Sequence, residues 1–313
     1  MKVLITGAGG FIGGYLVDRL RAAAGFEVEA TDRDDLDVGD FDLVSAVIGE
    51  SRPDAVCHLA ALCGAAPSRA NPLEYYRVNT QGTVNVLDAC RKAGVPSFLL
   101  ASSLTVFGSG NDAKREDSAH APRHPYAVSK SAAEGIARSY SAEFGLRCAI
   151  VRPTLVVGPG CKEPHAIGDF VRRAIRGETI EIQGSGDHRR DFVHPSDVAD
   201  AIAACLVRLE RSDRGTCESF NISEGTAISM KSLAESIVSR AGAGGIAFAA
   251  STNQTFSLFA DIDRARVELK FEPRYSLDRI VAEMIRENQE TRPDAYAPHD
   301  DCRHDDQRSV LVA

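Results

Sequence analysis

Apolar and polar positions alternate over roughly the first 150 residues in a pattern that predicts strands and helices in turn. Unbroken apolar runs are typical of strands buried on both faces, whereas apolar residues at helical spacing indicate amphipathic helices. Strands are predicted at 2–6, 27–32, 54–61, 97–102 and 147–153. Helices are predicted from Phe11 to Gly25 and at 42–51, 72–93 and 125–145. This order predicts an α/β, Rossmann-like, doubly wound parallel sheet with ligands at the C-terminal ends of its strands.

Beyond Pro153 the alternation is less regular and predicts a smaller second lobe. Helices are expected at 166–177, from about Ser196, at 229–241 and at 276–290, with a strand pair near 179–193. We therefore expect residues 1–153 to form a dinucleotide-binding domain, to which 191–215 return. Residues 154–190 and 216–291 are expected to form an interleaved substrate-binding lobe. The polar, proline-interrupted tail at 292–313 is expected to be disordered.

Charge and cysteine usage narrow the class of protein. The 313 residues carry a formal net charge of -8, which argues against nucleic acid or an anionic membrane as partner. The start lacks the longer apolar region of a secretory signal, and no apolar stretch approaches the roughly 20 residues that a membrane span needs. The 8 cysteines form no CxxC pair, and four of them, Cys57, Cys90, Cys148 and Cys205, lie in apolar runs. Reduced thiols in a cytoplasmic protein are the expectation.

A glycine-rich turn joins the first strand to the first helix. In TGAGGFIG, Gly7, Gly10 and Gly13 let backbone N–H groups approach a pyrophosphate at the positive end of the helix. Asp32 ends the second strand, where a carboxylate can accept hydrogen bonds from the adenosine ribose and repel a 2′-phosphate. This favours NAD, although the adjacent Arg33 leaves NADP open. Asp37 and Val38 are expected beside the adenine.

The segment YAVSK places a tyrosine and a lysine on one face of a helix. Tyr126 and Lys130 are four residues apart, and their helix follows the fourth strand, where the sheet should face a cofactor. A phenol has a pKa near 10. A cation at about 4 Å, with an effective dielectric of about 20, favours the phenolate by about 4 kcal/mol, or about three pKa units. Lys130 and the positively charged nicotinamide together therefore make Tyr126 a candidate general base near neutral pH.

Two serines follow the fourth strand in the segment ASSLTVFG. The Ser103 hydroxyl can hold the substrate oxygen that Tyr126 deprotonates, whereas Ser102 is expected to be structural. His58, in HLAA, is likewise expected to be structural beside the cofactor. The expected cofactor-binding residues are Gly7, Gly10, Phe11, Ile12, Gly13, Asp32, Arg33, Asp37, Val38, Leu59, Ala60, Ala61, Tyr126, Lys130 and Pro153.

Seven motifs taken together resemble the extended short-chain dehydrogenase/reductase family, in its NAD-dependent epimerase/dehydratase group. They are TGAGGFIG, HLAA, VNTQGTVNVLDAC, SSLTVFG, YAVSK, VRPTLVVGPG and RRDFVHPSDVADA, and they cover about residues 1–290 in the family's order. The resemblance implies Ser103, Tyr126 and Lys130 as the catalytic set, with Asn79 in a structural role nearby. It also implies a homodimer formed through two helices of each chain, one of them containing Tyr126.

The residues after Ser103 discriminate among the reactions of that family. Its 4,6-dehydratases carry an Asp-Glu pair where this chain has Leu104 and Thr105, so dehydration is disfavoured. Decarboxylases of nucleotide sugars usually carry a Glu at the second position and are disfavoured too. The motif SSLTVFG is most similar to the Ser-x-Thr-Val-Tyr-Gly of UDP-hexose 4-epimerases, with Phe107 for the tyrosine. Ser103, Thr105 and Arg190 are the expected substrate-binding residues.

Two further positions depart from the epimerase pattern. Leu155 stands where those epimerases carry an asparagine that contacts a diphosphate, and Ser251 stands where they present an arginine. Arg190 matches a phosphate ligand of the family, but a salt bridge to Asp191 or Asp197 is the alternative role. A substrate without a full nucleotide therefore stays open.

These observations favour an NAD-dependent sugar-nucleotide 4-epimerase. The alternative is a net NAD(P)-dependent oxidoreductase, either a 4-keto-sugar-nucleotide reductase or a sugar-acid dehydrogenase. An NAD-sensing binding protein without turnover is disfavoured because the catalytic trio is complete. A metal site from His299, Cys302 and His304 is disfavoured because their spacing is loose, and no metal is expected.

Overall fold

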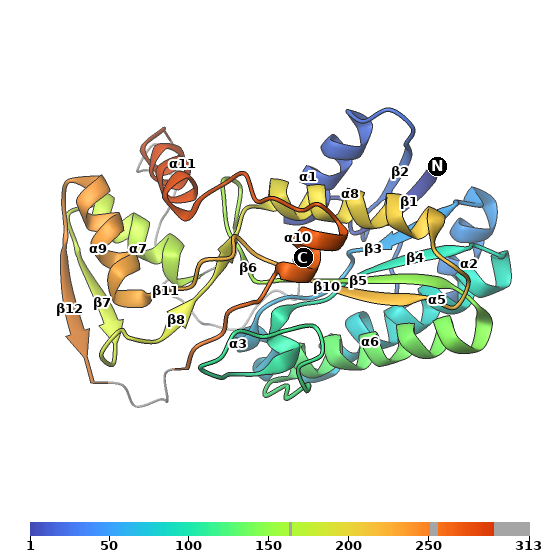
Figure 1. Ribbon diagram of the computed structural model, residues 1–313, viewed down its shortest axis with the longest axis horizontal. Helices are drawn as coiled ribbons and strands as arrows, with labels where there is room; N and C mark the ends of the chain where they lie inside the picture. The colour runs from blue at the N-terminus through green and yellow to red at the C-terminus, as the bar shows by residue number, and fades with distance from the viewer. Residues whose placement is uncertain (163–164, 251–255, 291–313) are drawn as a thin grey trace.

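A six-stranded parallel sheet forms the centre of the larger lobe, at the right of Figure 1. The computed structural model describes residues 1–162, 165–250 and 256–290. The sheet has the order β10-β5-β4-β3-β1-β2. Its strands are β1 (Lys2–Thr6), β2 (Glu27–Thr31), β3 (Ala55–His58), β4 (Ser97–Ala101), β5 (Arg147–Pro153) and β10 (Cys217–Ile222). The predicted α/β, doubly wound fold is confirmed.

Helices cover both faces of the sheet. One face carries α1 (Phe11–Arg21) and α8 (Pro195–Arg211), which pack on each other and on the sheet through a shared apolar core. The other face carries α2 (Phe41–Ser51), α5 (Gly82–Ala93) and α6 (Pro125–Phe144). Strands buried on both sides need apolar residues at every position, which is why the unbroken runs in the sequence locate them.

Short helical segments connect the longer elements. They are α3 (Ala65–Ala70), α4 (Pro72–Tyr75), a π-helical turn (Tyr76–Gln81), the 3₁₀ helix Leu104–Phe107 and α10 (Asp263–Glu268). The predicted helix at 72–93 is therefore one helical stretch with a π-helical turn inside it, and α3 is an addition that the sequence pattern did not indicate.

A third apolar core forms the smaller lobe. It joins α7 (Ala166–Ile175), α9 (Met230–Ala241) and α11 (Leu277–Glu290) to the parallel pair β7 (Thr179–Gln183) and β12 (Gly245–Ala249). Two-residue strands complete it: β6 (Leu155–Val156) pairs with β9 (Phe192–Val193), and β8 (Arg189–Arg190) pairs with β11 (Ile228–Ser229).

Two expectations about this region need correction. The strand pair expected near 179–193 does not exist as a hairpin, because β7 and β8 each pair with strands that lie far along the chain. Residues 217–222 were expected in the substrate lobe but form β10, the edge strand of the central sheet beside β5. Non-local register of this kind is set by the assembled sheet and leaves no local signal. The tail expected to be disordered lies outside the described residues.

Candidate active site

The turn between β1 and α1 is shaped as an anion cradle. Gly7 has a φ of 73°, and a Cβ added at Gly13 would lie 2.4 Å from the Gly7 carbonyl oxygen, so both positions need glycine. Gly10 is the N-cap of α1, and within the described part of the chain no side chain caps this helix. Its first N–H groups are therefore available to a phosphate. The structure brings Gly7, Gly10 and Gly13 together as predicted, with Phe11 and Ile12 opening the helix.

Asp32 lies against this turn. A Cβ added at Gly9 would fall 2.0 Å from its Oδ2, so the carboxylate occupies the space that the glycine leaves. The Arg33 backbone N–H donates to Asp32 Oδ1 at 2.7 Å, while the Arg33 side chain is exposed. A carboxylate at the end of β2 and an uncapped helix at the end of β1 fit a dinucleotide's ribose and pyrophosphate.

The residues expected beside the adenine are held differently from each other. Val38 is buried, and its carbonyl accepts a hydrogen bond from Asn85 Nδ2 at 2.9 Å. Asp37 forms an ion pair with Arg77 at 3.4 Å and accepts from the Gly39 N–H at 2.8 Å. Asp37 thus orders the loop after β2, and its carboxylate is already engaged.

The HLAA segment ends β3 beside the cradle. His58 Nδ1 and Thr6 Oγ1 are 2.8 Å apart, and burial, together with the nearby Lys130, lowers the pKa of His58 to about 3. His58 is therefore neutral and bonded to the neighbouring strand, in agreement with a structural role. Leu59 and Ala61 are buried, and Ala60 is partly exposed. Pro153 is the last residue of β5, which is separated from β3 by β4 alone.

Asn79 fixes the loop that follows HLAA. Its side chain accepts from the Leu62 N–H at 2.7 Å and donates to the Leu62 carbonyl at 2.9 Å. It also donates to Ser129 Oγ at 3.0 Å, and Ser129 bonds to the Tyr126 carbonyl at 2.8 Å. Asn79 therefore joins the end of β3 to the first turn of α6, where the YAVSK motif lies.

Tyr126 and Lys130 occupy the first turns of α6. The helix begins at Pro125, where the missing N–H is not needed. The Tyr126 ring stacks on His124 with centroids 6.0 Å apart and meets the edge of Tyr75 at 6.3 Å. Lys130 is buried, and its Nζ donates to the Ala101 carbonyl at 2.7 Å. Burial lowers the pKa of Lys130 to about 8.

Ser103 begins the 3₁₀ helix after β4, and α6 packs against that helix. Ser103 Oγ accepts from the Thr105 N–H at 3.3 Å and from the Thr105 hydroxyl at 2.9 Å. Leu104 points into the core and is 1% exposed. The three catalytic candidates thus lie on α6 and the β4 end that it covers, and no carboxylate occupies positions 104 and 105.

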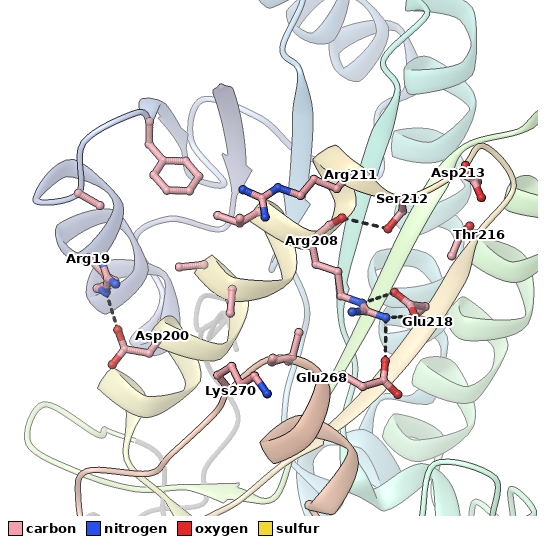
Figure 2. A pocket seen from close by; sticks show the side chains of 16 residues that line it. Arg19, Asp200, Arg208, Arg211, Ser212, Asp213, Thr216, Glu218, Glu268 and Lys270 are labelled. Carbon is pink, nitrogen blue, oxygen red and sulfur yellow. Dashed lines mark hydrogen bonds and ion pairs between the residues drawn. The ribbon is translucent and has the colours of Figure 1, made fainter.

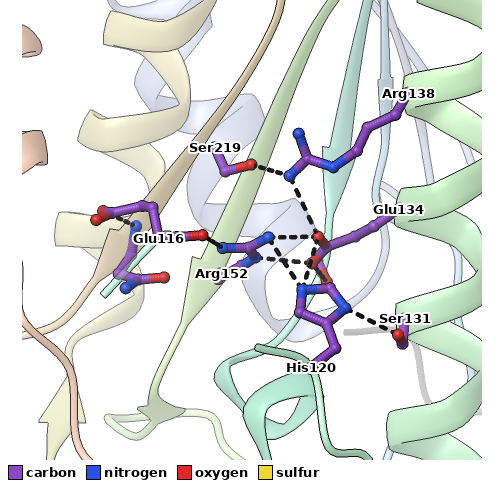
Figure 3. A network of polar contacts seen from close by, with 9 residues as sticks. Glu116, His120, Ser131, Glu134, Arg138, Arg152 and Ser219 are labelled. Atoms are coloured by element: carbon purple, nitrogen blue, oxygen red, sulfur yellow. Dashed lines mark hydrogen bonds and ion pairs between the residues drawn. The ribbon is translucent and has the colours of Figure 1, made fainter. Parts of the chain in front are cut away.

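A buried charge network under α6 was not foreseen from the sequence (Figure 3). Arg152 of β5 pairs with Glu134 of α6 at 2.6 Å, and both side chains are 1% exposed. Ser102 Oγ donates to Glu134 at 2.6 Å, which gives that serine its structural role. His120 Nε2 lies 3.2 Å from Arg152 Nη2, and Arg138 Nη2 lies 3.7 Å from Glu134. The sequence hints at this network only through Arg152, a charged residue inside the apolar run of β5.

Arg190 does not form the salt bridge to Asp191 or Asp197 that was the alternative to a phosphate contact. Its guanidinium lies over the Phe256 ring at 4.9 Å and donates to the carbonyls of Phe256 and Arg189. Within the described residues it pairs with neither Asp191 nor Asp197. Asp197 instead accepts from the Arg274 and Tyr275 N–H groups, and burial raises the pKa of Asp191 to about 7. Leu155 is exposed, and Ser251 lies outside the described residues.

A cavity of about 770 Å³ opens away from these residues, between α1, α8 and the start of β10 (Figure 2). Phe26 and Thr216, which immediately precede β2 and β10, line it. The cavity therefore lies at the N-terminal ends of these parallel strands, whereas Ser103 follows the C-terminal end of β4. Arg208 in its wall is paired with Glu218 and Glu268 at 2.6 and 2.7 Å. These carboxylates engage Arg208, and the cavity contains none of the predicted catalytic residues.

The described residues hold neither a metal-binding cluster nor a membrane-spanning helix. No cluster of three or more His, Cys, Asp or Glu side chains within 1–162, 165–250 and 256–290 could hold a metal ion. His299, Cys302 and His304 lie outside those ranges. None of the helices that the structure describes has both the length and the apolar character to span a membrane.

Comparison with known proteins places the chain in a family. The family model for the NAD dependent epimerase/dehydratase family matches residues 3–223. The chain belongs to this family. That assignment confirms the family resemblance, the enzyme class and the NAD cofactor expected from the cradle and Asp32.

Three relatives show the range of reactions within the family. A UDP-glucose 4-epimerase of Azospirillum brasilense is 30% identical, with 90% of each chain covered. A dTDP-glucose 4,6-dehydratase of Streptomyces niveus is 28% identical over 91% of this chain and 92% of that one. The structure of MoeE5 in complex with UDP-glucose and NAD has a TM-score of 0.81 and 32% identity, covering 92% of this chain and 99% of that one. Epimerases and dehydratases of nucleotide sugars are thus similar to this family member.

Proposed function

We propose that the protein is an NAD-dependent sugar-nucleotide 4-epimerase. The observation that carries the proposal is the Ser103–Tyr126–Lys130 set with no carboxylate beside it: Leu104 is buried in the core, and the Thr105 hydroxyl is bonded to Ser103. Reversible oxidation at a sugar hydroxyl needs a base and an orienting hydroxyl. Elimination of water needs an additional acid and base, which these positions lack.

Lys130 and Tyr126 supply the proton chemistry. A charged ammonium one helical turn from the phenol favours its ionised form, so Tyr126 can take the proton of a sugar hydroxyl. The bond from Lys130 Nζ to the Ala101 carbonyl fixes the ammonium in place. NAD, when bound at the C-terminal ends of the strands, would supply a reversible hydride acceptor.

Ser103 orients the substrate oxygen. Because its Oγ already accepts from the Thr105 hydroxyl, its own proton is directed outward as a donor. Ser103 therefore stabilises the oxygen that Tyr126 deprotonates, and Thr105 fixes the Ser103 rotamer. Both roles extend the proposed site set to positioning as well as proton transfer.

A net oxidoreductase is the second candidate, and two observations favour it. Leu155 is exposed where an amide would contact a diphosphate, and Arg190 lies over Phe256. Both features suit a substrate without a full diphosphate, such as a free sugar acid, and so favour the sugar-acid dehydrogenase.

The two candidates differ in their product balance. We would incubate the enzyme with NAD and a panel of UDP-, dTDP- and GDP-sugars and free sugar acids. An epimerase interconverts the two 4-epimers without accumulating NADH. Stoichiometric NADH with any substrate would overturn the epimerase proposal and support the dehydrogenase, and NAD(P)H-dependent reduction of a 4-keto nucleotide sugar would support the reductase.

Arg190→Ala tests whether the substrate carries a nucleotide diphosphate. The change should raise KM for a nucleotide sugar about 10- to 150-fold, because a charge-assisted phosphate contact contributes about 1.5–3 kcal/mol. Arg189→Ala is the matched control, since Arg189 lies over Phe259 on the adjacent position. An unchanged KM in Arg190→Ala would favour a substrate without phosphate.

We also propose a cytoplasmic homodimer with an N-terminal cofactor domain and a smaller substrate lobe. The dimer would form through α5 and α6, which lie together on one face of the sheet. Light scattering of the purified chain measures its mass in solution, and a monomer at micromolar concentration would contradict this arrangement.

A further inference from the structure

Two cysteines face each other across the edge of the central sheet. β5 and β10 are parallel neighbours, and their register places Cys148 directly opposite Cys217. In-register residues of adjacent strands point to the same face, with strands about 4.8 Å apart. Disulfides span Cα separations of about 4.4–6.8 Å, so the backbone spacing suits a cross-strand bond. Both side chains are free thiols in the structure.

The two thiols have different surroundings. Cys148 is fully buried beneath α6, and its Sγ donates to the Ala137 carbonyl at 3.7 Å. Cys217 is the first residue of β10 and is only partly buried. The neighbouring Cys148 thiol and Arg138 lower the pKa of Cys217, whereas the neighbouring Cys217 thiol and burial raise the pKa of Cys148. Cys217 is therefore the thiol that ionises and meets solvent first.

The strand that carries Cys217 can adjust to a shorter sulfur–sulfur distance. β10 is the edge of the sheet, so it pairs with only one neighbour. Cys217 follows Gly215, whose φ of 80° marks a turn immediately before the strand. A first residue next to a turn moves with fewer bonds broken than one in mid-strand, whereas Cys148 stays fixed between β4 and β10.

We propose that Cys148 and Cys217 form a reversible oxidation site at which a peroxide converts the two thiols into an intrachain disulfide. The Cys217 thiolate attacks one peroxide oxygen, the O–O bond breaks, and Cys217 sulfenic acid and hydroxide form. The Cys148 sulfur then attacks the Cys217 sulfur, and the S–O bond breaks. The proton released by Cys148 joins the departing hydroxide as water. The two sulfurs lose two electrons, and the peroxide is reduced to water.

The disulfide would link the edge strand β10 to β5, the strand that follows α6 in the chain. Ser219 of β10 accepts a hydrogen bond from Arg138, and Arg138 also lies beside Glu134. Oxidation therefore fixes a strand already joined to α6 by this contact. Closing the chain between Cys148 and Cys217 also restricts the unfolded state, so the oxidised protein should unfold at a higher temperature than the reduced one.

The test uses the full chain, reduced and then treated with hydrogen peroxide. Peptide mass spectrometry without reduction should find Cys148 linked to Cys217, with a mass loss of two hydrogen atoms and a raised Tm, both reversed by dithiothreitol. Cys217→Ser should abolish the link and the Tm shift. Cys161→Ser, at another partly buried cysteine, should leave both unchanged. In Cys148→Ala, a dimedone adduct should appear at Cys217.

Two results would overturn the proposal. One is a wild-type protein in which Cys148 and Cys217 stay reduced while other cysteines oxidise. The other is a peroxide-induced Tm rise of equal size in Cys217→Ser. Because Cys217 is partly exposed, the serine variant should fold, and its reduced-state Tm serves as the check.

Discussion

The central sheet and the smaller lobe organise their backbones in different ways. The sheet is one continuous parallel array with strands of 4–7 residues, and helices cover both faces. Outside this sheet, the described chain forms three two-stranded sheets, two of them built from two-residue strands. Long paired strands carry the cradle and Ser103, whereas the short pairs are supplemented by side-chain contacts such as that of Arg190 with Phe256. Under the proposed function, the reaction chemistry would rest on the long strands and the choice of substrate on the short ones.

The largest effect that tests this division comes from Tyr126→Phe. Removal of the phenol proton acceptor should lower turnover about 100- to 10,000-fold, the usual contribution of a general base. NAD affinity should stay nearly unchanged, because the cradle is untouched. Steady-state kinetics and NAD titration measure the two quantities. Tyr140→Phe, further along α6, is the control; wild-type turnover in Tyr126→Phe would refute the base assignment.

Arg152→Met tests the buried network that holds α6 on β5. The change leaves Glu134 as an unpaired buried charge and should cost about 3–5 kcal/mol of unfolding free energy. The double variant Arg152→Met/Glu134→Leu should recover much of this loss. Arg91→Met, whose partner Asp88 is at the surface, should cost less than about 1 kcal/mol. Denaturant melts measure all three, and equal losses in Arg152→Met and Arg91→Met would contradict the network's importance.

Gly13→Ala and Gly14→Ala form a matched pair in the first helix. A Cβ at position 13 would collide with the Gly7 and Ala8 carbonyls, whereas nothing lies within 4 Å of one at position 14. Overpacking costs about 1–3 kcal/mol, so Gly13→Ala should weaken NAD binding about tenfold. Gly14→Ala should bind NAD normally and gain up to about 1 kcal/mol of stability. Calorimetric titration that ranks the two equally would exclude the proposed cradle.

A further test is the pH dependence set by Lys130. With its pKa lowered to about 8 by burial, Lys130 loses its charge above that pH, and turnover should decline as Tyr126 loses electrostatic support. Stability should change in the opposite direction. The unfolded lysine titrates near 10.4, so between about pH 8 and 10.4 the unfolded state binds more protons and the folded state gains with rising pH. Lys130→Met should lack that gain in a series of melts; an identical pH response would contradict the assignment.

The parts of the site that the sequence predicted are local ones. Gly7, Gly10 and Gly13 are close in the chain, and Tyr126 and Lys130 share one helix face, so spacing alone brings each set together. Asp32 needed only the next strand. The sequence predicts these residues because one strand, one turn and one helix fix their positions, without contacts from distant parts of the chain.

The parts that were missed depend on pairing between distant segments. β10 joins β5 more than sixty residues later in the chain, and β7 pairs with β12 over a similar separation. The Arg152–Glu134 pair combines a strand and a helix whose charges look unremarkable separately. Arg190 meets Phe256 rather than a nearby carboxylate. Such contacts follow from packing, and no spacing rule along the chain encodes them.

The Asn79 carboxamide has a consequence for what can replace it. It gives a hydrogen to the same residue from which it receives one, as a peptide group of an adjoining strand would do. Aspartate keeps the shape but loses the donor and would set a negative oxygen against a carbonyl. Serine and leucine are too short or too apolar to reach both atoms. The side chain thus does for the Leu62 peptide what a strand backbone does inside the sheet, and it holds the loop beyond β3 where no strand continues.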